Sequence, residues 1–262
     1  ANNQPARGFC RVSCSLSLKN LFFSYDRRPV FDGLNLSIEG TGIIGLLGLN
    51  GQGKSTLLKI LSGVLPASVE TTCSTTDRHL IGYLPERPQF YPELTVYENI
   101  CFSAEINGVK KPELHNRVSD TIGKTQLAGH SRQLAGTLSK GYQQRLGLAM
   151  ATAHEPRFLI LDEPTDGLDP RQVEETQAFI RDYASNACVV ISSHRIDEIS
   201  RLCMRMLILH QGSLVDDSLI ENDEQRQNLT AKFHQLTGQP QSPPESEAES
   251  QTESGSESGS TP

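Results

Sequence analysis

GLNGQGKST, residues 48–56, lies between a short apolar run and a segment with helical periodicity. The apolar run IIGLL, residues 43–47, has the length and the bounding glycines of a buried strand. Downstream, apolar residues recur at helical spacing from Leu57 until Pro66 ends the pattern. Residues 48–56 therefore connect a strand to a helix. We call them the phosphate loop, because this arrangement is typical of phosphate-binding sites.

The glycines of the phosphate loop let successive backbone N–H groups turn inward and form a concave nest for a polyphosphate. The helix that begins near Lys54 adds the positive end of its dipole. Lys54 is expected to reach the β- and γ-phosphates, while the Ser55 hydroxyl holds a magnesium ion that bridges them. The residues of this loop predicted to bind the nucleotide are Gly48, Asn50, Gly51, Gly53, Lys54, Ser55 and Thr56. A purely structural glycine-rich turn is the alternative.

The chain has 262 residues, which suffices for one α/β domain of ordinary size or two small ones. It has no apolar run near the roughly 18 residues that would cross a bilayer, so we expect a soluble chain that needs a partner for any membrane role. The first residues lack the apolar core of a secretory signal. Six cysteines without paired metal-ligand spacing predict reduced thiols in a cytosolic setting rather than a zinc site.

Much of the formal net charge of −7 comes from the C-terminal end, where five glutamates and no basic residue follow position 240. The rest of the chain is nearly neutral and has no basic stripe with interleaved aromatic residues, which argues against nucleic acid as the main ligand. Residues 237–262 are rich in Ser, Glu and Pro and are expected to form a disordered acidic tail. An inert tail is favoured over a phosphorylated or partner-binding one.

Two strands are predicted before the phosphate loop, at residues 15–23 and 31–38, on either side of a polar turn at residues 26–29. They would form an antiparallel β subdomain after an N-terminal extension, residues 1–14. Tyr25 stands at the turn, where it either stacks on a purine ring or caps the edge of the core.

The rest of the chain alternates strands and helices. Residues 67–79 are polar and predict an edge hairpin, and the pattern is helical from 95 to 135. A strand is predicted at residues 81–84, and buried strands are predicted at residues 158–161 and 188–191. Helices are predicted to begin at Ser139 and at Asp169, which are good N-cap residues. This alternation predicts a mostly parallel sheet with its ligand chemistry at the carboxyl edge.

Acidic and histidine side chains follow two of these buried strands. Asp162 and Glu163 come directly after the strand at residues 158–161, and His194 comes after the next one. Asp162 is expected to orient the magnesium ion, and Glu163 to polarise an attacking water. His194 is expected to contact the γ-phosphate and to sense its presence. The alternative is a capped strand end with solvated charges.

The chain resembles the nucleotide-binding subunits of ATP-binding cassette (ABC) transporters over about residues 15–216. The resemblance rests on the order of the phosphate loop, Glu86, residues 138–142, Asp162-Glu163, residues 167–169 and His194. It implies an α/β P-loop NTPase fold at residues 15–236, with a mostly parallel core sheet, an N-terminal antiparallel β subdomain and an α-helical insert at about residues 86–137. It also implies ATP and Mg²⁺ as ligands, with Ser55, Glu86 and Asp162 at the metal and Glu163 and His194 as catalytic residues.

The same resemblance identifies residues 138–142 as the signature segment of the family, made of Leu138, Ser139, Lys140, Gly141 and Tyr142. This segment would bind the γ-phosphate of ATP held by a second subunit, with Asp169 coupling the two sites. Two subunits would then face each other head to tail, as a homodimer or as a heterodimer with a related cassette. The implied function is ATP hydrolysis that powers a separate integral membrane permease, contacted by the helical insert, at the cytoplasmic face of the inner (plasma) membrane.

Three features depart from the common family pattern. Glu86 replaces a glutamine, Lys140 and Tyr142 replace a glycine and a glutamine, and residues 67–79 are shorter than the usual hairpin. This version resembles subunits that serve bacterial multidrug and antibiotic exporters, gliding motility and copper-enzyme maturation, which favours export. The alternatives are a non-transport cassette ATPase, which usually carries long coiled coils or two cassettes, and an unrelated P-loop phosphotransferase such as a small-molecule kinase.

Overall fold

The computed structural model describes residues 15–66 and 78–237. Its strands are β1 (Ser15–Tyr25), β2 (Arg28–Glu39), β3 (Gly42–Leu47), β4 (Ile81–Leu84), β5 (Phe158–Asp162), β6 (Cys188–Ser193), β7 (Arg205–His210) and β8 (Ser213–Leu219). Its α-helices are α1 (Lys54–Leu61), α2 (Val96–Ile106), α3 (Lys111–Lys124), α4 (Lys140–Thr152), α5 (Pro170–Ala184), α6 (Ile196–Ile199) and α7 (Asp223–Thr237). Short 3₁₀ turns lie at η1 (Arg78–Leu80), η2 (Ala128–His130) and η3 (Ala135–Thr137).

Six strands form the central sheet in the order β4-β5-β6-β3-β7-β8, and all neighbouring pairs are parallel except β7 with β8. The residues of β5 and β6 are buried throughout, as expected of parallel strands covered on both faces. Leu47 pairs with Ser193 and Asp162 pairs with Ser192, so β3, β5 and β6 end together at one edge. The predicted mostly parallel α/β sheet is confirmed.

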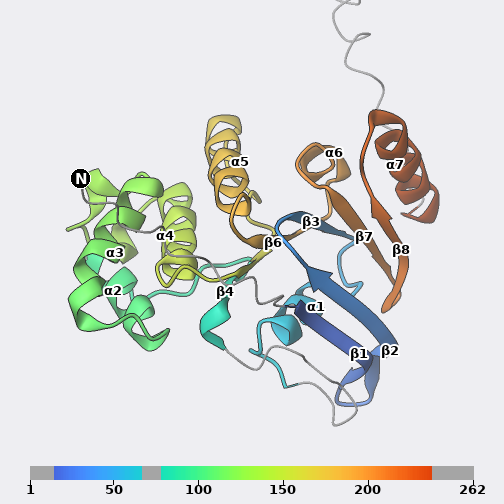
Figure 1. Cartoon of the computed structure of the whole chain (residues 1–262), viewed down its shortest axis with the longest axis horizontal. Coiled ribbons are helices and arrows are strands. Elements are labelled where there is room, and N and C mark those ends of the chain that lie inside the picture. The colour runs from blue at the N-terminus through green and yellow to red at the C-terminus, as the bar shows by residue number, and fades with distance from the viewer. Residues whose placement is uncertain (1–14, 67–77, 238–262) are drawn as a thin grey trace, which may run out of the picture.

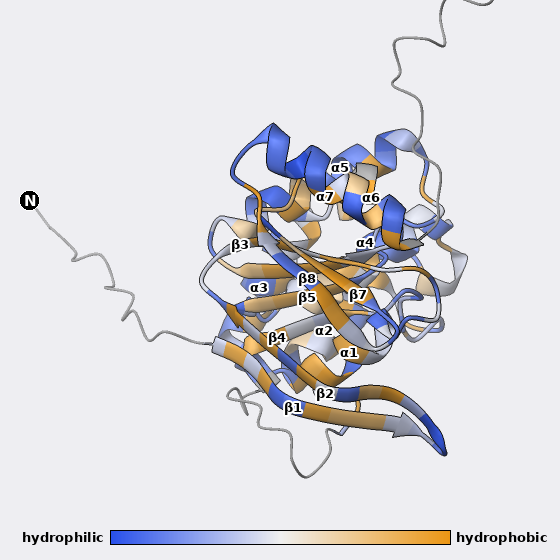
Figure 2. Cartoon of the chain, turned by 90° about the vertical axis from the view of Figure 1, so that its right-hand side faces the viewer, coloured by the Kyte–Doolittle hydropathy of each residue, from blue (hydrophilic) through white to orange (hydrophobic). Residues whose placement is uncertain are grey.

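Each face of this sheet has its own hydrophobic core. On one face, Ile44 and Ile160 pack with α1 and with the β1-β2 hairpin. On the other face, Ile43 and Leu159 pack with side chains of α4, α5, α6 and α7. Figure 2 shows the central strands as mainly hydrophobic and the outer sides of α5 and α7 as hydrophilic. The sheet therefore forms the middle layer of a three-layer structure.

The N-terminal hairpin is antiparallel, as predicted, but both strands are longer than predicted. Tyr25 pairs with Arg28, so the turn consists of two residues instead of the predicted four. Asp26 enables this tight turn because it adopts the left-handed conformation, with φ 52°. The hairpin lies beside α1, below the central sheet in Figure 1.

The predicted helical region after Glu86 contains α2, α3 and two of the 3₁₀ turns, and it lies to the left in Figure 1. Helix α2 begins with a capping box between Thr95 and Glu98. Val96 and Ile100 of α2 and Val118 of α3 pack against α4 in a third core. The break between the helices is at Gly108, where φ is 87°.

Two predicted segments lie outside the described residues. These are the N-terminal extension and the acidic tail from residue 238 onward. The predicted edge hairpin is also outside up to residue 77, and the residues that follow form η1 instead of a strand. Within residues 15–66 and 78–237, none of the helices is long and apolar enough to cross a membrane.

Candidate nucleotide-binding site

The phosphate loop joins the end of β3 to the start of α1, as predicted. Gly53 caps α1 with φ 101°, a conformation that disfavours other residues. Gly48 has no room for a side chain, because a Cβ there would lie 2.6 Å from the Leu209 carbonyl oxygen. These two glycines let the loop turn tightly against β7 and direct its backbone toward the sheet edge.

An open cleft of about 450 Å³ lies beside this loop. Its lining residues are Tyr25, Val30, Leu49, Asn50, Gly51, Gly53, Lys54, Ser55, Thr56, Glu86, Glu163, Asp166 and His194. The structure thus brings the predicted loop residues, except Gly48, together with Tyr25, Glu86, Glu163 and His194 from four other segments. Three lining residues, Val30, Leu49 and Asp166, were not predicted as site residues.

Lys54 is buried in the loop, with only 6% of its side chain exposed. Its ammonium donates to the carbonyl oxygens of Gly48, at 2.7 Å, and Leu49, at 3.3 Å. Burial lowers the pKa of Lys54 below its ordinary value, while the nearby Glu163 carboxylate opposes this shift. A phosphate beside the Lys54 ammonium would favour its charged form, which is the form that binds phosphate.

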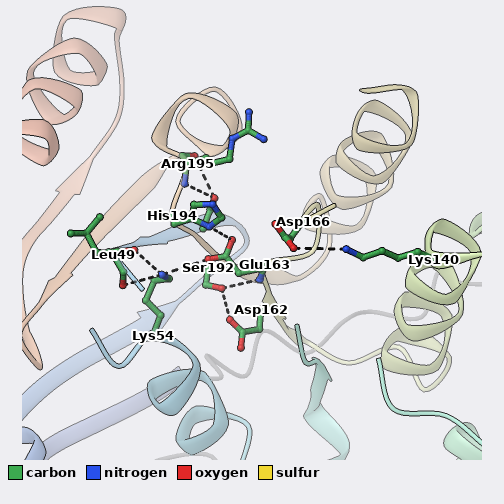
Figure 3. A network of polar contacts seen from close by, with 11 residues as sticks. Leu49, Lys54, Lys140, Asp162, Glu163, Asp166, Ser192, His194 and Arg195 are labelled. Carbon is green, nitrogen blue, oxygen red and sulfur yellow. Dashed lines mark hydrogen bonds and ion pairs between the residues drawn. The ribbon is translucent and has the colours of Figure 1, made fainter. Parts of the chain in front are cut away.

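The Glu163 carboxylate lies between the Lys54 ammonium and the His194 imidazole (Figure 3). One carboxylate oxygen lies 3.5 Å from Lys54 Nζ, and the other lies 3.0 Å from His194 Nδ1. Glu163 has φ 48°, a left-handed conformation that is costly for a residue with a side chain. Its side chain is nevertheless only 12% exposed, so the surrounding contacts fix the carboxylate at the wall of the cleft.

Ser192 connects the ends of β5 and β6 behind this carboxylate. Its hydroxyl accepts from the Glu163 backbone N–H at 2.9 Å and donates to Asp162 Oδ1 at 2.7 Å. Both Ser192 and Asp162 are fully buried. The sequence prediction missed Ser192, although a polar residue at the end of an apolar strand, two positions before His194, was a visible signal.

Three residues were predicted to hold magnesium. Ser55 and Glu86 line the cleft, while Asp162 lies behind its wall with one oxygen bound to Ser192. Among the described residues, no group of three or more His, Cys, Asp or Glu side chains forms a metal cluster. This donor set fits Mg²⁺ in a nucleotide site, because Mg²⁺ there takes one or two protein ligands and fills its shell with water and phosphate oxygens.

The signature segment does not contribute to this cleft in the same chain. Ser139 is the N-cap of α4, and its side chain makes no capping hydrogen bond. Leu138 and Gly141 are buried, and Gly141 lies against Gln172 of α5. The Tyr142 ring packs on His130, with ring centroids 3.9 Å apart.

Asp169 lies at the start of α5, where its carboxylate accepts from the Gln172 N–H at 2.9 Å. It is the N-cap residue of this helix, as predicted, and it is absent from the cleft. The start of α5 packs against the start of α4 through Gln172 and Gly141. The structure thus brings Asp169 and the signature segment to one region, and neither lines the cleft.

Comparison with known proteins identifies the family. A family model described as ABC transporter matches residues 31–166. The chain belongs to the ABC transporter family. It is the ATP-binding subunit of such a transporter and an ATPase, as the resemblance predicted. This membership excludes the alternative of an unrelated P-loop phosphotransferase.

The relatives of this ABC ATPase include named transport proteins. The bacitracin transport ATP-binding protein BcrA of Bacillus licheniformis is 33% identical over 239 residues, covering 87% of this chain and 77% of that protein. The lantibiotic transport ATP-binding protein SrtF of Streptococcus pyogenes is 29% identical over 221 residues, covering 82% and 95%. A solved ATP-binding subunit of an ABC transporter matches with a TM-score of 0.76 and 26% identity, covering 86% of this chain and all of that one.

Proposed function

We propose that two copies of this ABC ATPase pair head to tail, so that each ATP is bound by the cleft of one copy and the signature segment of the other. The observation that carries this proposal is the separation of the two parts within one chain: residues 138–142 are absent from the cleft that contains Lys54 and Glu163. The start of α4 supports it, because its N–H groups and positive dipole end suit an anion and the Ser139 hydroxyl is not used as a cap. A related cassette is the alternative partner.

Within the cleft, Lys54 and the loop N–H groups bind the phosphates, and Tyr25 stacks on the base. Ser55 and Glu86 would hold Mg²⁺ and Asp162 would orient it through water, and the ion would neutralise charge on the phosphate oxygens. Glu163 accepts the proton of the attacking water, and His194 hydrogen-bonds both Glu163 and the γ-phosphate. The contacts of Glu163 with Lys54 and His194 support this role, because they orient its carboxylate without burying it completely.

We also propose that the transporter partner is an integral membrane permease contacted through the helical insert. Four large apolar side chains are exposed around α2: Tyr91, Phe102, Ile106 and Leu134. Tyr91 and Phe102 touch edge to face, with ring centroids 5.1 Å apart, so these two side chains form a continuous apolar surface. The similarity to bacitracin and lantibiotic transport proteins supports export of an antimicrobial compound from the cytoplasmic side of the inner membrane.

The central test is Glu163→Gln. The amide keeps the size of the side chain but accepts a proton poorly, so ATP hydrolysis should fall by a factor on the order of 10² to 10⁴ while ATP binding persists. Trapped pairs should then accumulate in ATP and Mg²⁺, as measured by sedimentation. Glu174→Gln on α5, outside the cleft, is the control and should hydrolyse ATP normally. Wild-type turnover by Glu163→Gln would disprove its role as the base.

A further inference from the structure

Lys140, the first residue of α4, extends toward the loop that follows β5 (Figure 3). Its Nζ lies 3.9 Å from Asp166 Oδ2 and fills the space that a side chain at residue 167 would need, which Gly167 leaves open. Asp166 in turn lines the cleft. Lys140 therefore links the signature segment of this chain to the cleft of the same chain.

Buried contacts hold α4 in this position, independently of the ion pair. Gln144 lies one helical turn beyond Lys140 on the same side of α4, is buried, and donates to the Pro164 carbonyl oxygen at 3.0 Å. Gly141 packs directly on Gln172 of α5. These contacts fix how α4 lies on the loop, so the backbone of Lys140 keeps its place near residues 166 and 167 whether or not the ammonium is paired.

The ion pair itself is exposed on both sides, with 65% of the Lys140 side chain and 52% of the Asp166 side chain accessible. Exposed pairs at this distance add little to stability because water competes for both charges. A triphosphate offers stronger, charge-assisted hydrogen bonds to an ammonium. Lys140 can therefore exchange its carboxylate for a phosphate with little loss.

We propose that Lys140 changes partners during the ATPase cycle: it pairs with Asp166 of its own chain, and on closure it binds the γ-phosphate of ATP held by the second copy. This inference rests on the head-to-tail pairing proposed above. Lys140 thus adds a positive charge to the signature segment and selects triphosphate over diphosphate. Because Asp166 also faces the cleft of its own chain, it competes with the second copy's nucleotide for Lys140.

The test uses a non-hydrolysable ATP analogue with Mg²⁺ and measures the analogue concentration that gives half-maximal pairing by sedimentation. Lys140→Gln should raise this concentration on the order of tenfold, because a charged hydrogen bond to phosphate is lost. Asp166→Asn should lower it about two- to fivefold, because Lys140 is released from an exposed ion pair. In the Lys140→Gln background, Asp166→Asn should have no further effect. Pairing of Lys140→Gln should also be less sensitive to salt.

A matched control is present on α3, where Lys124 Nζ lies 2.9 Å from Asp120 Oδ2 and both side chains are exposed. Lys124→Gln and Asp120→Asn make the same charge changes outside the cleft and the signature segment, and they should leave pairing unchanged. Wild-type pairing of Lys140→Gln, or an undiminished effect of Asp166→Asn in its background, would overturn the inference. If the wild-type protein does not pair with any triphosphate, the head-to-tail proposal itself is wrong.

Discussion

The cleft and the signature segment of this ABC ATPase differ in how their functional side chains are held. At the cleft, the buried Lys54 ammonium donates to the Gly48 carbonyl oxygen and pairs with Glu163. Behind the cleft wall, the buried Ser192 hydroxyl of β6 donates to Asp162 of β5. In the signature segment, Ser139 makes no capping hydrogen bond, and the Lys140 side chain is 65% exposed. The comparison teaches that one chain organises the cleft by itself, whereas the groups of the signature segment are exposed, as the proposed pairing with a second copy requires.

Besides Glu163→Gln, the largest effect is expected from removing the buried cation of the cleft. Lys54→Ala should lower ATP turnover about 100-fold or more and weaken nucleotide binding at least about tenfold, because it removes a charged hydrogen-bond donor at the phosphates. Nucleotide titration and phosphate release measure the two effects. Lys59→Ala, on the same helix but outside the cleft, is the control. Unchanged nucleotide affinity of Lys54→Ala would contradict the assignment of the phosphate loop.

A second substitution tests whether the buried network holds the catalytic carboxylate. Ser192→Ala leaves Asp162 and the Glu163 N–H without their shared partner, so the free energy of unfolding should fall by about 1 to 3 kcal/mol. ATP turnover should fall about tenfold, with the pH profile of turnover shifted, because Glu163 loses its fixed position.

The neighbouring Ser193 provides the control for this substitution. It is equally buried, but its hydroxyl hydrogen-bonds only within its own loop, with the Arg195 backbone. Ser193→Ala should therefore retain turnover while losing some stability. Equal loss of turnover in the two variants would show that Ser192 has only a structural role.

Two helix N-caps, Ser139 and Thr95, test whether the signature segment serves pairing rather than stability. Ser139→Ala should weaken ATP-driven pairing several-fold, on the order of one hydrogen bond, and should leave the melting temperature unchanged. Thr95→Ala breaks the capping box of α2 and should cost about 1 kcal/mol of stability without affecting pairing. Sedimentation and thermal unfolding separate the two outcomes. A stability loss in Ser139→Ala without a pairing defect would show that Ser139 caps α4 and does not contribute to pairing.

The smallest expected effect is the pH dependence of nucleotide affinity and of stability that Lys54 causes. Burial lowers the pKa of Lys54, so its ammonium loses its proton at a pH below that of an ordinary lysine. Nucleotide affinity should fall in this alkaline range, by less than about tenfold per pH unit. Over the same range the unfolded chain binds more protons than the folded one, so the contribution of Lys54 to stability should rise. Lys54→Met should lack both trends in nucleotide titrations and thermal unfolding measured against pH.

The sequence alone predicted most of the cleft. The phosphate loop is contiguous, and its glycines, lysine and serine carry their function in their order along the chain. Asp162, Glu163 and His194 were predicted to converge because parallel strands that end at one edge bring distant residues together. Family membership confirms the fold and the ATPase activity, while the individual roles of these residues remain predictions.

Other features depend on register and packing, which no single segment specifies. Ser192 bridges Asp162 and Glu163 only because β5 and β6 pair with Asp162 opposite Ser192. The hairpin turn is two residues long because Asp26 adopts a left-handed conformation that most residues avoid. The sequence pattern therefore located these elements but not the contacts between them.

The phosphate loop and the two acids at the end of β5 were determined by the sequence itself, because a local motif and a buried apolar run specify them. The tertiary structure decided what they contact. It set Glu163 between Lys54 and His194 and directed Lys140 toward Asp166, although the two members of each of these pairs are far apart in the chain. The physical reason is that such contacts arise from side-chain packing between elements, which is specified only when the whole sheet and its helices assemble.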